Sequence, residues 1–431
     1  MFKVIETFSG IGSQSQALKN IGVDYSIEAT VEWEIAAIYA YDIIHNGAQN
    51  LKDYRHHTKQ SIIEELSKYS ISNDGKAPIT TRGINSMSMS HLKGVLAAID
   101  RNNNLVDITK VDAEDLPEAD LLTYSFPCQD LSISGNWHKN EGGIDRDANN
   151  RSTLLWQIER ILIALENSNK PLPKFLLMEN VSNILSNKHI KNFEEWCSFL
   201  ESLGYINQVY TLDARDFGVP QSRVRTYMIS VLATDHEVVE ELQDYFFYNN
   251  LENYQVDYSK MKSLENYLRL DYSNDIYRNE AIESTPQFTQ SREKIYMLNK
   301  KLAKGQNEIL STFARTETTK QDRHPNSGII LYDDQNPLTS INSKYRNLTP
   351  RECFLLMGFN EDSFNLLMKN NIFAESSKKL LTTSKLIKLA GNSIVVQVLE
   401  VIFEQLMDIN ETIIKKHDRK LESVEETIYL T

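Results

Sequence analysis

Residues 2–13 read FKVIETFSGIGS, and this stretch decides the fold class that the rest of the sequence supports. Residues 4–8 are largely apolar, as expected of a buried strand, and Gly10 and Gly12 follow them directly. Ser13 is placed to cap a helix that begins after this turn. A strand, a glycine-rich turn and a helix in this order predict a Rossmann-like unit, in which backbone amides meet a ligand at the helix N-terminus.

The alternation of strands and helices continues along the chain. We predict strands at residues 26–31, 121–125, 175–178, 209–212 and 226–232, and helices at residues 36–44, 154–166 and 193–203. From about residue 233 the sequence is polar and rich in Asn and Tyr, and helical periodicity returns at residues 349–357, 376–387 and 395–407. The predicted fold class is therefore α/β, a wound sheet interrupted by a smaller, irregular domain before the C-terminal helix.

This pattern also divides the chain into regions. Residues 1–232 and 385–410 are assigned to the α/β domain, and residues 233–384 to the irregular domain. Residues 46–104 are rich in Asn, Ser, Lys and Gly and are interpreted as an insertion in the first domain. Residues 411–431 are expected to form a charged, loosely packed tail.

The composition is that of a soluble globular protein, with 41% apolar and 24% charged residues among 431. No apolar run approaches the roughly 18 residues that a membrane span requires, so no membrane partner is expected. The three cysteines, Cys128, Cys197 and Cys353, are far apart and match neither a disulfide nor a zinc spacing. We therefore expect a cytoplasmic protein without a bound metal.

The net charge of −13 argues mildly against a nucleic-acid partner, because phosphate contacts require clustered Lys and Arg. The distribution of charge matters more than the total, however. Residues 286–351 contain eleven Lys and Arg against six Asp and Glu, a local net charge of +5. The region is either a solvated face or a surface for an anionic partner.

Cys128 stands in SFPCQD, directly behind a proline and just after a predicted strand. Pro127 restricts the backbone and would hold the thiol in one direction. A second apolar strand, FLLMENV, ends on Glu179. A thiol nucleophile beside a carboxylate that carries a proton is suited to attack on an electron-poor ring. Taken alone, Glu179 is equally explained as an acid at a helix N-terminus.

Two further pieces come from neighbouring strand ends. Arg223 and Arg225 alternate in QSRVR, so their side chains point to the same face of a strand. Taken alone they are also explained as surface charges. Glu32 lies 20 residues after Gly12, where an acid can hold a ribose hydroxyl pair. Nucleotide sites, S-adenosylmethionine sites and plain tight turns all use such a glycine pattern.

Taken together and in this order, the motifs resemble those of the bacterial DNA cytosine-5 methyltransferases. The matching segments are FSGIG (8–12), EW (32–33), the acid at 107, FPCQ (126–129), RSTL (151–154), ENV (179–181), QSRVR (221–225), LTPREC (348–353) and GNS (391–393). The resemblance implies an S-adenosyl-L-methionine site formed by Phe8, Gly10, Gly12, Glu32, Trp33, Asp107, Leu154, Asn392 and Ser393. It makes residues 1–232 and 385–410 the Rossmann-like methyltransferase domain and residues 233–384 the target-recognition domain.

The resemblance also implies a mechanism. The Cys128 thiolate adds to C6 of cytosine while Glu179 shares a proton with N3, and C5 then accepts the methyl group. Arg225 contacts O2, and Arg223 supports the site electrostatically. Positive charge on the arginines is expected to raise the thiolate fraction of Cys128. The base must leave the duplex to react.

The expected partner is double-stranded DNA, bound by a monomer, with a restriction endonuclease acting separately. In the loop after the catalytic cysteine, Gln129 and Ser134 are expected to contact DNA, with hinges at Gly135, Gly142 and Gly143. The +5 region offers Arg315, Arg323 and Arg346 as candidates for reading base edges, with phosphate contact as the alternative for each.

Two departures from the family pattern stand out. Ser13 replaces a glycine that the family often has, and the loop from 129 to 150 is longer than the shortest family versions. Three other functions compete with the main one. A transfer-RNA cytosine-5 methyltransferase shares the catalytic set, an inactive homologue would bind DNA only, and a nucleotide-dependent oxidoreductase would explain the glycine turn alone.

Overall fold

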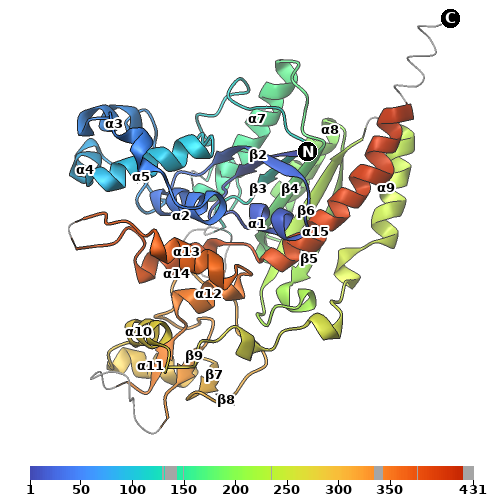
Figure 1. The fold of residues 1–431 in the computed structure, drawn as a ribbon. Coiled ribbons are helices and arrows are strands. Elements are labelled where there is room, and N and C mark those ends of the chain that lie inside the picture. Colours follow the sequence, from blue (N-terminus) through green and yellow to red (C-terminus); the bar gives the residue numbers. More distant parts are fainter. Residues whose placement is uncertain are drawn as a thin grey trace, which may run out of the picture.

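The computed structural model describes residues 1–128, 131, 143–148, 150–233, 235–333, 343–375 and 377–420 (Figure 1). Its main sheet has six strands in the order β2-β1-β3-β4-β6-β5. Their bounds are β1 Phe2–Thr7, β2 Tyr25–Val31, β3 Leu121–Tyr124, β4 Phe175–Val181, β5 Tyr205–Asp213 and β6 Val224–Leu232. Neighbours among β1 to β4 are parallel, and β6 runs antiparallel to both β4 and β5. The predicted α/β fold class with a wound, parallel-rich sheet is confirmed.

Alternate residues of each central strand pack into two different apolar cores, as the period of two in a strand requires. In β1, Val4 belongs to one core and Ile5 to the other; in β3, Leu121 and Leu122 divide in the same way. The first core contains the helices α1 Ser13–Asn20, α2 Ile35–Asn46 and α15 Val396–Ile409. The second contains α7 Leu155–Asn167 and α8 Ile190–Ser202. Helices therefore cover both faces of the sheet.

The predicted insertion is helical. It contains α3 Lys59–Leu66, α4 Thr81–Ser86 and α5 Met89–Arg101, and α5 packs on α2. Short helical turns elsewhere are η1 Leu51–Tyr54, η2 Arg151–Leu154, η3 Ser182–Leu185, η4 Ala214–Phe217, η5 Leu251–Asn253, η6 Tyr258–Lys260 and η7 Leu264–Asn266.

A second, four-stranded sheet in the order β10-β9-β7-β8 lies apart from the first, in the lower part of Figure 1. Its strands are short: β7 Lys301–Lys304, β8 Glu308–Ile309, β9 Ile329–Leu331 and β10 Tyr345–Asn347. It is accompanied by α10 Asp275–Glu283 and α11 Gln290–Leu298. The remaining helices of this half pack on the main domain: α9 His236–Tyr248 lies on β5, and α12 Pro350–Leu356, α13 Glu361–Lys369 and α14 Thr383–Asn392 lie near α2.

Two local expectations differ from the structure. Gly12, not Ser13, is the N-cap of α1, and the Ser13 hydroxyl instead forms a 2.6 Å hydrogen bond with Ser393 Oγ. The helix expected at residues 376–387 begins only at Thr383, because the Thr382 hydroxyl caps it and the Asn371 side chain holds the preceding loop at Leu381.

The expected loosely packed tail is wrong for residues 411–420. The C-terminal helix continues from α15 through the π-helical turn η8 Asn410–Ile414, because its apolar side chains Ile413 and Ile414 are buried. Lys416 and Lys420 pair with Glu241 and Glu237 on α9, each at 2.6 Å. Thr383–Lys420 also contains a window apolar enough to cross a membrane, but 72% of it is buried inside the protein, as in a core helix.

Candidate active site

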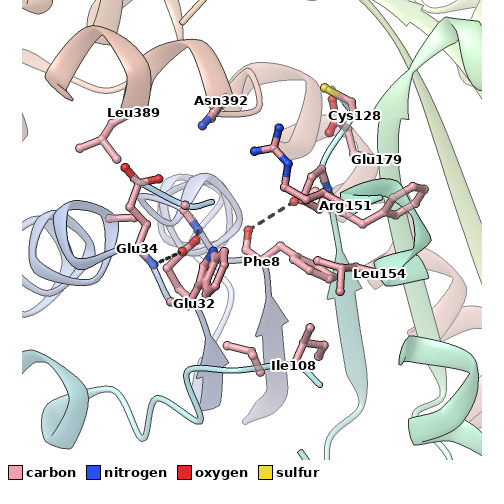
Figure 2. Close-up of a pocket in the computed structure, with 18 of the residues that line it drawn as sticks. Phe8, Glu32, Glu34, Ile108, Cys128, Arg151, Leu154, Glu179, Leu389 and Asn392 are labelled. Atoms are coloured by element: carbon pink, nitrogen blue, oxygen red, sulfur yellow. Dashed lines mark hydrogen bonds between the residues drawn. The ribbon is translucent and has the colours of Figure 1, made fainter. Parts of the chain in front are cut away.

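One pocket, of about 240 Å³, lies at the carboxyl ends of β1 to β4 (Figure 2). It brings together most of the residues that the sequence proposed for the cofactor and for catalysis. Those that line it are Phe8, Gly10, Glu32, Trp33, Asp107, Cys128, Leu154, Glu179, Arg223, Arg225 and Asn392. Gly12 and Ser393 do not line the pocket, but Ser393 directly follows Asn392 of its wall, and Gly12 lies two residues after Gly10.

The turn after β1 owes its shape to left-handed backbone conformations. Phe8, Gly10 and Gly12 have φ of 54°, 55° and 77°. A Cβ on Gly10 would meet nothing within 4 Å, so the space above this residue is open to a ligand. A Cβ on Gly12 would lie 2.2 Å from His45 Nε2. Burial lowers the pKa of His45 to about 4, so its neutral ring donates to the Ile11 carbonyl at 2.9 Å and fixes the turn.

The carboxylate of Glu32 stands at the end of β2, where it accepts hydrogen bonds from the amides of Gly10 (3.1 Å) and Glu34 (2.8 Å). Burial raises its pKa to about 7, against the opposing effect of these bonds. Asn104 binds both the amide and the carbonyl of Glu32 and also the amide of Val106, which places Asp107 beside Glu32. No motif in the sequence pointed to Asn104.

These groups fit an adenosyl ligand. Trp33 offers a flat apolar surface for an aromatic base, and Glu32 and Asp107 offer acceptors for hydroxyl and amino donors. The Asp107 carboxylate also accepts from the amide and the hydroxyl of Thr109, at 3.1 and 2.7 Å, which fixes its orientation. The open space above Gly10 completes the fit for S-adenosyl-L-methionine.

The segment that carries Cys128 is held from both sides. Asn180, which follows Glu179, donates to the carbonyl of Phe126 at 3.1 Å, and the Ser152 hydroxyl donates to the carbonyl of Pro127 at 2.7 Å. The thiol therefore has a fixed position beside β4. Asn180 and Ser152 support the segment that carries Cys128, and both lie within motifs quoted from the sequence.

Cys128 and Glu179 share one electrostatic environment with Arg225, whose Nε lies 3.2 Å from Glu179 Oε1. Burial raises the pKa of Glu179, although Arg225 and Arg223 oppose it, so this carboxyl keeps its proton more readily than an exposed one. Burial also raises the pKa of the Cys128 thiol. The arginines act in the expected direction on the pKa of that thiol, but burial, with a smaller contribution from the charge of Glu179, outweighs them, so the thiol is less acidic than an ordinary cysteine.

Arg223 lines the pocket and also holds the backbone around it. Its buried guanidinium donates to the carbonyls of Glu317 (2.8 Å), Ser393 (2.7 Å) and Gly391 (3.2 Å). We therefore class Arg223 as a positioning residue, and its charge also lowers the pKa of Cys128 and Glu179 in the direction that electrostatic support requires. Ser393 is held on its other side by Ser13.

A segment of the smaller, irregular domain packs against the backbone that Arg223 binds. We call residues 314–319 the strap. The Gln221 side chain accepts from the amide of Glu317 at 2.8 Å and donates to the carbonyl of Leu356 at 2.9 Å. A Cβ on Gly391 would lie 2.4 Å from the carbonyl carbon of Thr318. Glycine is required there because the helix α14 and the strap are in direct backbone contact.

The residues proposed to contact DNA differ in their exposure, and some lie outside the described residues. Gln129 and Ser134, with the hinge positions Gly135 and Gly142, lie outside the described residues. Arg315 and Arg323 are partly exposed. Arg346 is fully buried, with its guanidinium paired to Glu352 at 2.8 Å, so it cannot read DNA and that prediction is wrong.

Several pocket residues were not anticipated. They come from the β2–α2 turn, from the insertion and from α14: Glu34, Asp74, Gly75, Lys388 and Leu389. Glu34 directly follows the EW motif, and Lys388 and Leu389 shortly precede GNS, so proximity to a motif was the available signal. No signal in the sequence pointed to Asp74 or Gly75, because the insertion matches no motif.

Comparison with known proteins agrees with this geometry. The profile of the family described as C-5 cytosine-specific DNA methylase matches residues 88–408. Type II methyltransferase M2.ScrFI of Lactococcus lactis subsp. cremoris is 31% identical over 411 residues, which cover 94% of this chain and 99% of the relative. Orphan methyltransferase M.SssI of Spiroplasma monobiae is 33% identical over 414 residues, which cover 94% and 97%.

The fold is also shared with solved structures. The S. pombe Dnmt2 methyltransferase aligns with a TM-score of 0.57 at 18% identity, over 95% of this chain and 100% of the other. The Entamoeba histolytica methyltransferase EhMeth aligns with a TM-score of 0.54 at 18% identity, over 95% and 98%. At this identity the likeness concerns the fold alone.

Proposed function

The chain belongs to the C-5 cytosine-specific DNA methylase family and is a DNA cytosine-5 methyltransferase, and from this premise we propose the route of its reaction. The enzyme methylates C5 of a flipped-out cytosine in a short duplex site through a covalent bond between Cys128 Sγ and C6. The observation that carries the proposal is that Cys128, Glu179 and Arg225 line the same pocket as the residues suited to an adenosyl ligand.

The chemistry assigned to the side chains follows from the weakness of cytosine C5 as a nucleophile. The Cys128 thiolate adds to C6, and Glu179, whose raised pKa favours the protonated carboxyl, donates to N3 as the ring gains electrons. Arg225 stabilises the charge that develops on O2. S-adenosyl-L-methionine supplies, when bound, the electrophilic methyl group. A base then removes the C5 proton, the thiolate leaves C6 as the C5–C6 double bond forms again, and N3 returns its proton to Glu179.

Because the pKa of Cys128 is raised, we propose that substrate binding helps to generate the thiolate. Burial of Cys128 disfavours the thiolate. As the cytosine approaches, the thiol passes its proton to solvent, and Arg225 favours the resulting anion, which then forms the bond to C6. We propose that the nucleophile is generated in the complex with DNA rather than stored in the free enzyme. Flipping the base costs a few kcal/mol, which contacts to the rest of the duplex must supply.

We assign the reading of sequence to the irregular half, with Arg315 and Arg323 as candidate contacts. Arg315 belongs to a group of cations with Lys300 and Lys301: burial lowers the pKa of both lysines, and Arg315 lowers each further. Such mutual repulsion is relieved when phosphate binds, so this group is suited to the DNA backbone. A local cluster of cations can bind phosphate even though the overall charge of the chain is −13.

We further propose that the enzyme is a cytoplasmic monomer and protects DNA from a restriction endonuclease that acts separately. The matched relatives include Type II and orphan methyltransferases, so the endonuclease needs a test of its own. Bisulfite sequencing of plasmid DNA from a host that expresses the chain reveals the target site. Challenge of that plasmid with endonucleases specific for the site then tests protection.

The decisive test of the route is the covalent bond. Duplexes with 5-fluorocytosine at the target should trap an adduct, because fluorine cannot leave as a proton, and peptide mass spectrometry should place it on Cys128. Cys128→Ser should bind cofactor normally and form no adduct, whereas the matched control Cys197→Ser, outside the pocket, should behave as wild type. An adduct on Cys197 or Cys353 would refute the assignment. Methylation of transfer RNA in place of DNA would favour the alternative substrate.

A further inference from the structure

The insertion takes part in the pocket through one short loop. Ser72 pairs with the turn after β2: its amide donates to the carbonyl of Trp33 at 2.7 Å, and its carbonyl accepts from the amide of Ile35 at 2.8 Å. The Ser72 hydroxyl closes the loop on itself by donating to the carbonyl of Ala77 at 2.6 Å and accepting from the amide of Gly75 at 3.0 Å. Asp74 and Gly75, at the tip, line the pocket.

A lysine from the far end of the chain joins this loop. Lys388 Nζ, on α14, lies 2.7 Å from the carbonyl of Asp74 and 2.8 and 2.7 Å from the two carboxylate oxygens of Glu34. Glu34 is the N-cap residue of α2, yet its side chain makes no capping bond and turns to Lys388 instead. A Cβ on Gly75 would be only 3.0 Å from Glu34 Oε2, so the loop presses closely on the ion pair.

Three segments that are remote in sequence therefore meet at one point of the pocket wall: the β2–α2 turn, the tip of the insertion and α14. Figure 2 shows Glu34 and Leu389 at the end of the pocket opposite Cys128. The Glu34 side chain is 10% exposed and that of Lys388 25%, so the pair is shielded but still reaches solvent. An ion pair of this kind can open without disturbing the apolar core.

We propose that Lys388 and Glu34 form a latch that holds the Asp74–Gly75 tip over the cofactor pocket, and that the insertion serves to retain S-adenosyl-L-methionine. The inference rests on the proposed cofactor. Lys388 and Glu34 are positioning residues, because they neutralise each other and act through the loop. Since the latch is remote from Cys128, it retains the methylated cofactor and its demethylated product alike and leaves the transfer step unchanged.

The test uses the full-length enzyme with S-adenosyl-L-methionine and measures the dissociation rate by the change in tryptophan fluorescence on displacement. Lys388→Met and Glu34→Gln should each speed dissociation roughly fivefold to tenfold, the amount expected for loss of a half-buried ion pair. The double variant should add little to either, because both remove one interaction. Lys68→Met is the matched control, since it removes an exposed pair with Glu65 within the insertion but away from the pocket.

Two further readouts separate the latch from a general loss of structure. In both single variants the KM for S-adenosyl-L-methionine should rise by a larger factor than the single-turnover rate falls. In the wild-type enzyme, hydrogen exchange at residues 71–78 should slow when cofactor binds, and in Lys388→Met it should not. Folded variants with wild-type dissociation rates, or no cofactor-dependent protection of residues 71–78, would overturn the latch. A wild-type enzyme that binds no S-adenosyl-L-methionine would instead overturn the proposed function.

Discussion

Replacing Gly391 by alanine tests whether the strap and the cofactor-closing motif form one rigid unit. The added Cβ would lie 2.4 Å from the carbonyl carbon of Thr318, 2.6 Å from its oxygen and 2.5 Å from the amide nitrogen of Thr319. Carbon atoms in contact are ordinarily about 3.5–4.0 Å apart, so backbone must move by about 1 Å. No flexible side chain is available to absorb the change, because all three of these atoms belong to the backbone.

The expected loss of stability has two parts. Overpacking a close contact costs about 1–3 kcal/mol. A strap displaced by this amount also weakens the hydrogen bond from Arg223 to the carbonyl of Glu317, now 2.8 Å, and a hydrogen bond to a charged group contributes about 1.5–3 kcal/mol. Because the two parts share one movement, the sum is about 2–5 kcal/mol rather than a strict addition.

Urea unfolding followed by circular dichroism measures this loss, and calorimetric titration with S-adenosyl-L-methionine measures its effect on the pocket. We expect weaker cofactor binding, because Asn392 follows the altered residue directly and lines the pocket. Gly83→Ala, in the helix α4, is the control: its Cβ would lie 2.6 Å from Ile79 Cγ1 and 3.0 Å from Ile79 Cδ1, so a side chain and no backbone must move, and alanine favours a helix. An unfolding midpoint and cofactor affinity equal to those of wild type in Gly391→Ala would refute the rigid junction.

Three other perturbations separate buried charges from functional ones. Burial raises the pKa of Glu6 to about 7, so between pH 4.5 and 7 the unfolded chain releases this proton while the native one keeps it, and stability falls as pH rises. Glu6→Gln should remove about 1.4 kcal/mol per pH unit of that slope and be more stable than wild type at pH 8; parallel unfolding profiles would contradict it. Arg346→Met should cost about 3–5 kcal/mol by leaving Glu352 unpaired, without a selective effect on DNA binding. Arg315→Ala should leave stability unchanged and weaken DNA binding, with a shallower salt dependence if it holds phosphate; the reverse pattern for the two arginines would refute their assignment.

The parts of the site that could be predicted are those fixed by local sequence. The last residues of a parallel strand lie at one edge of the sheet, so the positions of Glu32, Cys128 and Glu179 in the sequence were enough to predict that they meet. Each stands at the end of an apolar strand or shortly after it. Local pattern and tertiary position agree there because the carboxyl ends of neighbouring parallel strands lie side by side.

The parts that could not be predicted depend on partners remote in sequence. Arg346 stands in a basic region and was assigned to DNA, but Glu352 and Tyr272 enclose it completely. Arg223 stands in the same motif as Arg225, yet only the folded chain shows that it binds the backbone of the strap and of Ser393. Charge alone does not tell whether an arginine meets solvent, a ligand or a carbonyl.

The closure of the pocket by the last part of the chain has a consequence for synthesis on the ribosome. Arg223 is made well before Gly391 and Ser393, the residues whose carbonyls it binds, and α1 cannot pack on α15 until later still. At about 5–20 residues per second, the interval between residues 223 and 393 is roughly 8–34 s. Throughout it the nascent chain carries its nucleophile but no complete cofactor site. A chain that stalls or is cut before residue 391 is therefore expected to be inert, so the enzyme becomes active only after residues 391–393 have been made and have folded onto Arg223.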